Sequence, residues 1–363
     1  MRVDVVHPGE LGLGEISAWH AMQQATPSLG NPFLSPEFTV AVGRFRPESR
    51  VAVLTDSGSI VGFFPFERRR FGMGVPISGW LSPCHGLIHA PGVEWDPREL
   101  LRGCHLAAWK FDNLIPAQKP FMPFHACVDA APVIELSDGF DAYYAKLRVK
   151  SPHLCRELER KARKLGREVG ELRSTSSASE DLDALRTLIA WKSDQYRKTD
   201  HVDRFEHPWL VGLLESLLTA QGDYLSGALS VLYAGDRPVA AQFGLRAGAV
   251  VVGWFTGYDA SYSRYSPGLI QLMRLAEGAA ATGVTVIHMG KGAAKYTNTV
   301  KTGDIFVSQG TVTARSVLGT AHQASHAAVR RVWLAVGNNP MLHDPADALL
   351  RRSGISSRMY GKI

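Results

Sequence analysis

Three apolar runs separated by tight turns constrain the fold of this chain most strongly. The runs cover residues 228–233, 238–245 and 249–255, and short glycine-bearing segments join them. Runs of this length and spacing predict a three-stranded antiparallel meander. A helix is predicted next over 266–282, followed by a short strand over 284–289. This part of the chain therefore has the pattern of an α/β (α+β) domain.

The rest of the chain mixes helix and strand patterns. Capping residues and apolar periodicity predict helices over 15–25, 97–110, 140–167 with a break at Ser151-Pro152, 180–199 and 208–220. Apolar alternation predicts strands over 51–54 and 60–69, which form a hairpin around Asp56-Ser57-Gly58, and over 133–136 and 304–312. From 317 onward the pattern is helical.

Composition excludes a disordered, disulfide-stapled or membrane-spanning chain. Of 363 residues, 45% are hydrophobic and 20% are charged, enough apolar material for two domains. The four cysteines are too few to staple this length and lack CxxC spacing, so we expect reduced thiols and no metal site. The start lacks a signal-peptide pattern and the apolar stretches reach only about ten residues. We expect a cytoplasmic protein without a transmembrane segment.

The excess of basic residues is local. The chain has a net charge of +6, and residues 146–167 alone hold nine basic and two acidic residues. The rest of the chain is close to neutral, so no general nucleic-acid footprint is present and we expect no DNA partner. A solvated charged face explains such a run, and a surface that attracts phosphates or an acidic protein is the alternative.

The start of the predicted helix 266–282 has the chemistry of an anion site. Ser266 stands at the cap, Pro267 at the first helical position, and Gly268 leaves backbone N–H groups uncovered. Free amides and the helix dipole favour a phosphate at such a terminus. The same three residues also cap helices that bind nothing, and the sequence leaves both interpretations open.

The segment 287–296 joins a strand to a glycine-spaced loop that holds a histidine, two lysines and a tyrosine. It has neither GxxxxGK[ST] nor GxGxxG spacing, so a nucleotide-hydrolysing or dinucleotide fold is unsupported. His288 has the chemistry of a general base, and Tyr296 that of a proton donor to a leaving thiolate. A structural histidine and a core tyrosine are the alternatives.

Several motifs together resemble a known family, the cellulose- and exopolysaccharide-associated (CelD-type) acetyltransferases of the GNAT superfamily. The resemblance covers most of residues 30–312. It is carried by Phe33-Leu34-Ser35-Pro36, Trp191-Lys192 with Gln195-Tyr196-Arg197, Phe205 with Pro208-Trp209, Pro238-Val239-Ala240-Ala241, Tyr258-Asp259 with Tyr265-Ser266-Pro267-Gly268-Leu269, and Gly290-Lys291-Gly292 with Tyr296.

The resemblance implies an architecture similar to the Fem-type aminoacyltransferases, with two GNAT-like domains in tandem. Each domain would be a mixed, mainly antiparallel sheet flanked by helices. We predict an N-terminal GNAT-like domain over 1–130, an acyltransferase domain over 131–316 and a helical C-terminal tail over 317–363.

The resemblance also implies roles for individual residues. Coenzyme A would bind at a turn formed by Tyr265, Ser266, Gly268, Leu269 and Ile270, and the strand 250–255 would offer an amide to the thioester carbonyl. His288 and Tyr296 would be catalytic. The acceptor would lie in a cleft between the domains, near Trp191, Lys192, Tyr196, Gln242, Trp254 and Lys291. This chain has His288 where the family usually has Asp and Thr297 where it usually has Lys, which bears on the substrate.

We therefore predict a GNAT acyltransferase that moves an acetyl or longer acyl group from acyl-CoA, or from an acyl-carrier protein, by direct attack on the thioester. The acceptor would be an amine or hydroxyl of a sugar-like molecule or small metabolite, in polysaccharide or secondary-metabolite biosynthesis. One alternative is a Fem-like transferase that uses aminoacyl-tRNA. Another is a degenerate fold that serves as an assembly partner. The oligomeric state stays open.

Overall fold

A computed structural model describes residues 1–176, 181–291, 297–315 and 319. Contacts divide the chain into two compact units. Unit 1 contains Met1–Asp129 and Tyr196–Arg204, with the described residues from Phe306 on, and unit 2 contains Ala130–Gln195 and Phe205–Ile305. The predicted tail lies outside the described residues except for Gly319.

Unit 1 is a mixed, mainly antiparallel sheet with helices on its faces. Its strand order is β1-β2-β3-β4-β6-β13, with β5 paired to β3 and only the β4–β6 pair parallel. The bounds are β1 Arg2–Val6, α1 Leu13–Ala25, α2 Pro36–Phe45, β2 Ser49–Asp56, β3 Ser59–Arg68, β4 Met73–Pro76, β5 Ile88–His89, α3 Pro97–Gly103, β6 Ala108–Leu114 and β13 Gly303–Thr313. The predicted hairpin is β2 and β3, and its turn residues Ser57 and Gly58 both have positive φ, as a tight hairpin requires.

Alternation along β3 gives unit 1 a core on each side of its sheet. Phe63 stacks on Trp19 of α1, with ring centroids 4.6 Å apart. Phe64 points to the other face, where it packs edge-on against Trp109 in a cluster that includes Leu100 of α3. Successive strand residues face opposite sides, so both faces of β3 are buried.

Unit 2 carries the predicted meander. Its strand order is β7-β12-β11-β10-β9-β8, and only the β11–β12 pair is parallel. The bounds are β7 His125–Glu135, α4 Gly139–Lys150, α5 Pro152–Glu168, β8 Leu172–Ser176, α6 Leu182–Lys198, α7 Pro208–Leu218, β9 Ser226–Ala234, β10 Arg237–Ala247, β11 Val250–Tyr258, α8 Pro267–Ala281, β12 Val286–His288 and α9 Thr297–Val300. The predicted fold class, α/β with an open mixed sheet flanked by helices, is confirmed.

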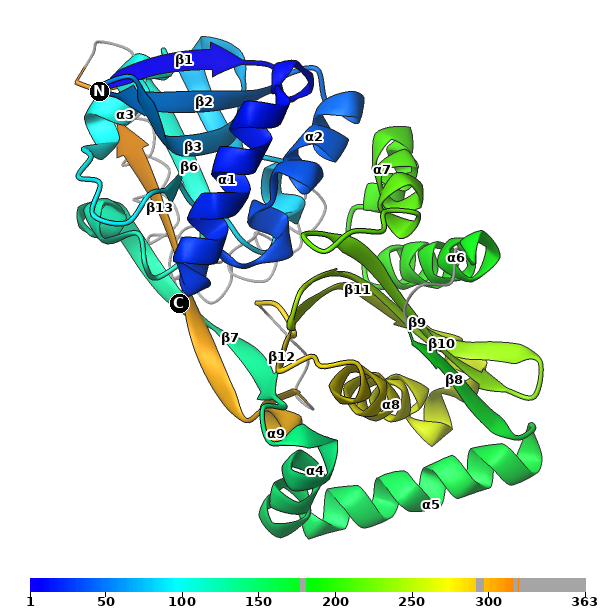
Figure 1. Cartoon of the computed structure of the whole chain (residues 1–363). Helices are drawn as coiled ribbons and strands as arrows, with labels where there is room; N and C mark the ends of the chain where they lie inside the picture. The colour runs from blue at the N-terminus through cyan, green and yellow to red at the C-terminus, as the bar shows by residue number, and fades with distance from the viewer. Residues whose placement is uncertain (177–180, 292–296, 316–318, 320–363) are drawn as a thin grey trace, which may run out of the picture. The chain divides into compact units, whose positions relative to one another are not determined.

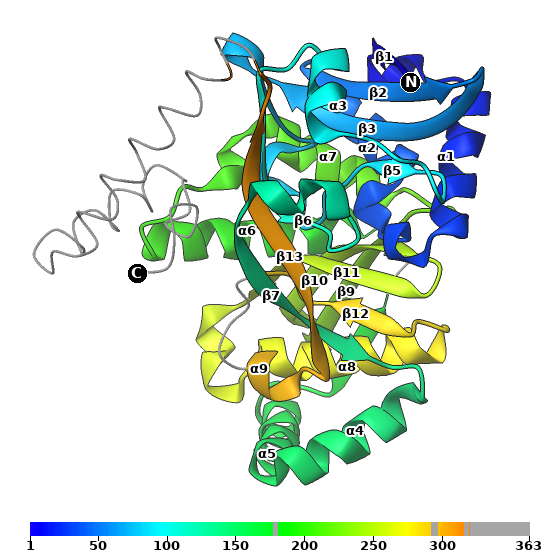
Figure 2. The same cartoon turned by 90° about the vertical axis from the view of Figure 1, so that its left-hand side faces the viewer.

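Helices cover both faces of the unit 2 sheet. In Figure 1, α8 lies along one face, α4 and α5 lie beyond it, and α6 and α7 cover the other face. Figure 2 shows α4 and α5 outside α8 from the side. The predicted break between α4 and α5 is confirmed: Ser151 leaves the helical region at φ −145° because the following residue is Pro152.

One predicted helix is wrong in its second half. The pattern over 97–110 predicted a single helix, but α3 ends at Gly103 and β6 begins at Ala108. Between them His105 has φ 53°, in the left-handed region. Ala108 and Trp109 are buried in the sheet, so their tertiary burial outweighed the helical pattern.

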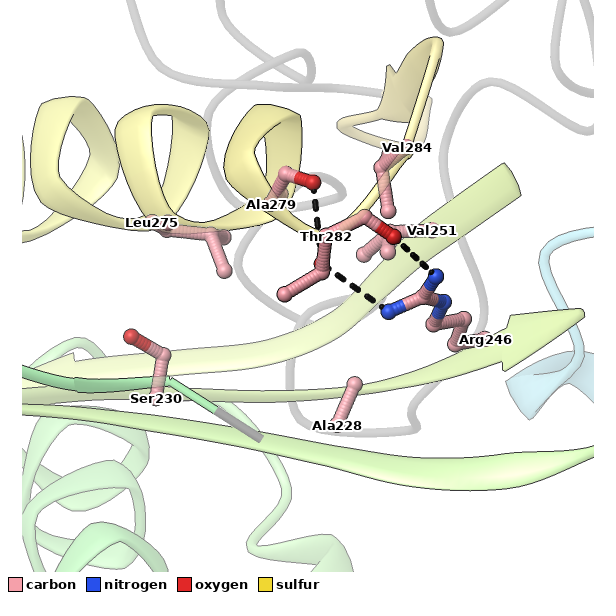
Figure 3. Close-up of a pocket in the computed structure, with 9 residues that line it drawn as sticks. Ala228, Ser230, Arg246, Val251, Leu275, Ala279, Thr282 and Val284 are labelled. Atoms are coloured by element: carbon pink, nitrogen blue, oxygen red, sulfur yellow. Dashed lines mark hydrogen bonds between the residues drawn. The ribbon is translucent and has the colours of Figure 1, made fainter. Parts of the chain in front are cut away.

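The C-terminal end of α8 is held to the sheet by an arginine (Figure 3). Arg246 of β10 donates to the carbonyl of Thr282 at 2.7 Å and to its Oγ1 at 3.0 Å. A cation at a helix C-terminus also interacts favourably with the helix dipole. The adjoining cavity, lined by Ser230, Leu275 and Val284 among others, has a volume of about 20 Å³, room for a water molecule and no substrate.

We predict that Arg246→Met lowers the free energy of unfolding by about 1–2 kcal/mol, because the last carbonyls of α8 lose a charged donor. Urea unfolding measures it. The control is Arg274→Met on the same helix, whose ion pair with Glu277 is exposed and should matter by no more than about 0.5 kcal/mol. Equal effects of the two substitutions would contradict this role.

Candidate active site

A β-bulge interrupts the meander where β10 and β11 pair. Phe243 pairs with Phe255, and the next residue, Gly244, pairs with Gly253, so Trp254 is the extra residue on β11. The ladder between β11 and β12 covers only Val250–Val252 of β11 in the described residues. Beyond Val252 the described residues form no further β11–β12 register. This part of β11 overlaps the predicted amide-donating strand 250–255.

Two glycines make the bulge sterically possible. A Cβ on Gly244 would lie 2.2 Å from the carbonyl oxygen of Val252, which is closer than atoms can approach. A Cβ on Gly253 would lie 2.6 Å from Nε2 of Gln242, the movable end of a side chain. Both positions favour glycine because neighbouring atoms approach closely. At Gly244 the neighbouring atom belongs to the backbone and cannot move aside, so no other residue fits there.

Three of the predicted site residues meet around Gly253. Gln242 is buried, accepts from Thr256 Oγ1 at 3.4 Å and has its amide against Gly253. Trp254 is the bulge residue, and the carbonyl of His288 lies 3.5 Å from the position of a Gly253 Cβ. The structure therefore brings Gln242, Trp254 and His288 to the point where β11 leaves β12.

His288 closes β12 in a form suited to accept a proton. Its neighbour Ile287 is buried in the core cluster that contains α8, so by strand alternation the His288 side chain belongs to the opposite face of the sheet. Burial lowers the pKa of His288 below its ordinary value of 6.5. The imidazole is therefore neutral near pH 7, as a general base must be.

The predicted anion turn is built differently from its prediction. Ser266 precedes α8 with φ 55°, and its side chain makes no capping hydrogen bond, although the sequence predicted a serine cap. The N–H groups of Leu269 and Ile270 bond to the Ser266 carbonyl instead. The Ser266 hydroxyl accepts from Lys161 Nζ of α5 at 3.0 Å. The left-handed backbone turns the serine side chain away from the helix amides and toward this lysine.

A second contact from α5 fixes the residue before the turn. Tyr265 is buried, and its hydroxyl donates to Glu168 Oε2 at 2.5 Å. Arg264 donates to the same hydroxyl at 2.6 Å. The hydrogen bond from Tyr265 lowers the pKa of Glu168. The turn Tyr265-Ser266 is thus held from two positions on α5, Lys161 and Glu168, which lie about two helical turns apart.

The predicted turn residues divide into two kinds. Leu269 and Ile270 point into the core, and their N–H groups bond to the Ser266 carbonyl, whereas Ser266 and Gly268 are half-buried. Sequence reasoning placed Lys161 in a basic run that flanks a donor site without assigning it a contact, and it missed Glu168. The charge of the run was the available signal; the contacts depend on how α5 packs.

The remaining predicted residues are dispersed. Trp191 lies beside β11, with its Cβ 3.5 Å from the position of a Gly257 Cβ. Burial lowers the pKa of Lys192, which donates to Gln195 at 2.9 Å. Tyr196 groups with unit 1, and its ring is tilted against that of His201, with centroids 6.5 Å apart. Lys291 follows Gly290 in the turn after β12, and Tyr296 lies outside the described residues.

Among the described residues no group of three or more His, Cys, Asp or Glu side chains could hold a metal ion. No described helix is long and apolar enough to cross a membrane.

Comparison with protein families identifies the central part of the chain. Residues 153–298 match the family described as an acetyltransferase (GNAT) domain. This segment runs from the start of α5 through the bulge, α8 and β12 into α9. Among curated proteins none matches the sequence.

Solved structures share the fold at low sequence identity. FemX is similar with a TM-score of 0.51 at 9% identity, over 85% of this chain and 96% of that chain. A protein of unknown function from Bacteroides thetaiotaomicron has a TM-score of 0.53 at 11% sequence identity, over 83% of this chain and 98% of that chain. A third similar structure is the C-terminal DUF2156 domain of a protein described as a lysylphosphatidylglycerol synthetase from Agrobacterium fabrum. Its TM-score is 0.50 at 11% sequence identity, over 84% of this chain and 95% of that chain. The chain carries a GNAT acetyltransferase domain and is an enzyme of the N-acyltransferase class.

We predict that Gly244→Ala costs about 3 kcal/mol or prevents folding, because its Cβ meets backbone that cannot move. Gly253→Ala should cost about 1–2 kcal/mol, because the Gln242 amide can shift. Urea unfolding compares them. In the double variant Gln242→Ala/Gly253→Ala the clash is absent, so its cost should be smaller than the sum of the two single costs. Strict additivity would show that Gln242 does not press on Gly253.

The pKa of His288 predicts a pH dependence of stability. Because the folded pKa lies below 6.5, the unfolded chain binds the proton more readily, and stability present above about pH 6.5 is lost as the pH falls toward the folded value. The urea midpoint between pH 7.5 and 5 should therefore fall more in the wild type than in His288→Gln. The exposed His153→Gln is the control and should follow the wild type. Parallel curves for wild type and His288→Gln would exclude a buried neutral imidazole.

Proposed function

We propose that this enzyme transfers an acyl group, acetyl in the simplest case, from acyl-CoA to an amine, with a hydroxyl as the alternative acceptor. The GNAT match supports the reaction class. The single observation that carries the choice of donor is the contact between Lys161 and Ser266 at the start of α8.

A diphosphate suits the turn before α8 for three reasons. The N-terminus of α8 presents the positive end of the helix dipole and the backbone N–H of Gly268, whereas the N–H groups of Leu269 and Ile270 bond to the Ser266 carbonyl. Gly268 has no side chain to cover this N–H group, and Tyr258 Cδ1 lies 3.6 Å from the position of a Gly268 Cβ. Lys161 Nζ adds a positive charge 3.0 Å from Ser266 Oγ. A phosphate can take the place of the serine hydroxyl as the acceptor of this lysine.

The part of β11 beyond its ladder with β12 suits the acyl end of the same donor. Acyl-CoA supplies the activated acyl group as a thioester. A backbone N–H on the edge beyond Val252 can donate to the thioester carbonyl as negative charge develops on it. The acceptor nitrogen forms the new C–N bond as the C–S bond breaks. His288 takes the proton from the nitrogen, and Tyr296, assigned from sequence alone, gives a proton to the leaving thiolate.

The acceptor is proposed from side-chain chemistry. Trp191 beside β11 and Trp254 at the bulge offer aromatic faces, and Gln242 offers an amide near the reacting edge. Aromatic and polar groups together suit a sugar-like amine. We therefore propose polysaccharide or secondary-metabolite biosynthesis as the context of the reaction.

Calorimetric titration with acetyl-CoA tests the donor. We predict that Lys161→Met raises the dissociation constant about tenfold or more, because a charge-assisted bond to phosphate contributes about 1.5–3 kcal/mol. The charge-matched control is Lys146→Met, whose amine pairs with Asp138 on the surface of α4 and which should bind within twofold of the wild type.

Two outcomes would contradict the proposal. If the wild-type protein binds no acetyl-CoA, acyl-CoA is not its donor. If Lys161→Met and Lys146→Met lose the same affinity for acetyl-CoA, Lys161 acts only through the net charge of the protein and does not contact a phosphate.

A further inference from the structure

One face of α5 carries a line of four arginines. Arg156, Arg160, Arg163 and Arg167 are all exposed, and their spacing of four, three and four residues places them in one stripe about 17 Å long. We call these four residues the arginine stripe. The buried residues of the helix, Cys155, Leu158 and Leu165, lie on the other side, in the core cluster with α8.

The charges of the arginine stripe are largely uncompensated within the described chain. Arg160 pairs with Glu157 at 2.7 Å, whereas Arg156, Arg163 and Arg167 make no ion pair with any described residue. Like charges three and four residues apart destabilise a helix. The like charges of the stripe disfavour α5, and its four side chains are exposed, which points to an anionic partner outside the chain.

The stripe lies beside the proposed donor turn. Lys161 and Glu168 project from the adjoining flank of α5, where they contact Ser266 and Tyr265. A partner bound to the arginine stripe therefore lies next to the side of α5 that contacts the start of α8. Lys161 already serves the compact diphosphate of CoA in the proposed site, so a second, elongated row of cations fits a longer acidic surface.

We propose that the arginine stripe docks the acidic helix of an acyl-carrier protein, whose phosphopantetheine arm enters at the α8 turn. The inference rests on the proposed function, because it requires that turn to bind a phosphate of the donor. The phosphopantetheine arm is attached to a serine of the carrier protein through one phosphate. The folded carrier domain must therefore lie just outside the site that binds this phosphate. The reaction is unchanged: the acyl carbon leaves the pantetheine sulfur for the acceptor nitrogen, and the proton of the nitrogen ends on the thiol.

The test compares two donors on the full chain by calorimetry at about 0.15 M salt. The probes are acetyl-CoA and a type II fatty-acid-synthase acyl-carrier protein with an acetylated arm. In Arg156→Glu/Arg163→Glu/Arg167→Glu we expect the dissociation constant for the carrier to rise at least tenfold and that for acetyl-CoA to stay within twofold. Retained acetyl-CoA binding also shows that the variant is folded.

The matched control reverses three exposed basic residues of unit 1 that make no ion pair with described residues, Arg44→Glu/Arg102→Glu/Lys119→Glu. It changes the net charge equally and should bind both donors as the wild type does. A comparable loss of carrier binding in this control would overturn the stripe as a specific surface.

Other results separate this inference from the proposed function. Failure of the wild type to bind the carrier while it binds acetyl-CoA overturns the inference alone, as does an equal loss of both donors in the stripe variant. Stripe-dependent binding of tRNA or of vesicles with 30% phosphatidylglycerol, without carrier binding, assigns the surface to another partner. Stripe-dependent carrier binding without any acetyl-CoA binding keeps the docking surface and overturns the CoA donor.

Discussion

The packing of α8 on the sheet of unit 2 is the constraint on which the proposed site depends. Its inner face buries leucines and methionine together with Ala276 and Ala279, whose small side chains let the helix lie close to the strands. Each large buried side chain contributes about 1.5–3 kcal/mol. Arg246 holds the end of the helix and α5 holds its beginning. The helix therefore presents its N-terminus at a defined place relative to β11.

The bulge gives the sheet a second defined feature. The extra residue Trp254 follows the last position paired with β12. A bulge bends and twists its strand, so the two parallel strands part where the bulge begins. Gly244 and Gly253 permit the close contacts that result. In the proposed function, the part of β11 beyond this ladder receives the thioester and the N-terminus of α8 receives a phosphate of the donor.

Local pattern predicted the elements of unit 2 well. The meander, α8, the break before Pro152 and the fold class are confirmed, because strand alternation, glycine turns and proline act within a few residues. Prediction failed where burial decided. The helix pattern over 97–110 ended at Gly103 because Ala108 and Trp109 pair in a sheet. The pattern over 133–136 gave no sign that β7 begins at His125.

The sequence by itself determined the meander of unit 2, the helix that follows it, the basic charge of residues 146–167 and the residues at the start of α8. It could not decide which basic residue meets Ser266, or that Ser266 turns its hydroxyl away from the helix it precedes. Only the packing of α5 against α8 decided that Lys161 and Glu168 reach the turn while the arginine stripe faces outward. The spacing of residues along a helix defines which of them share a face. Which element or solvent each face contacts is decided only when one face is buried against another element.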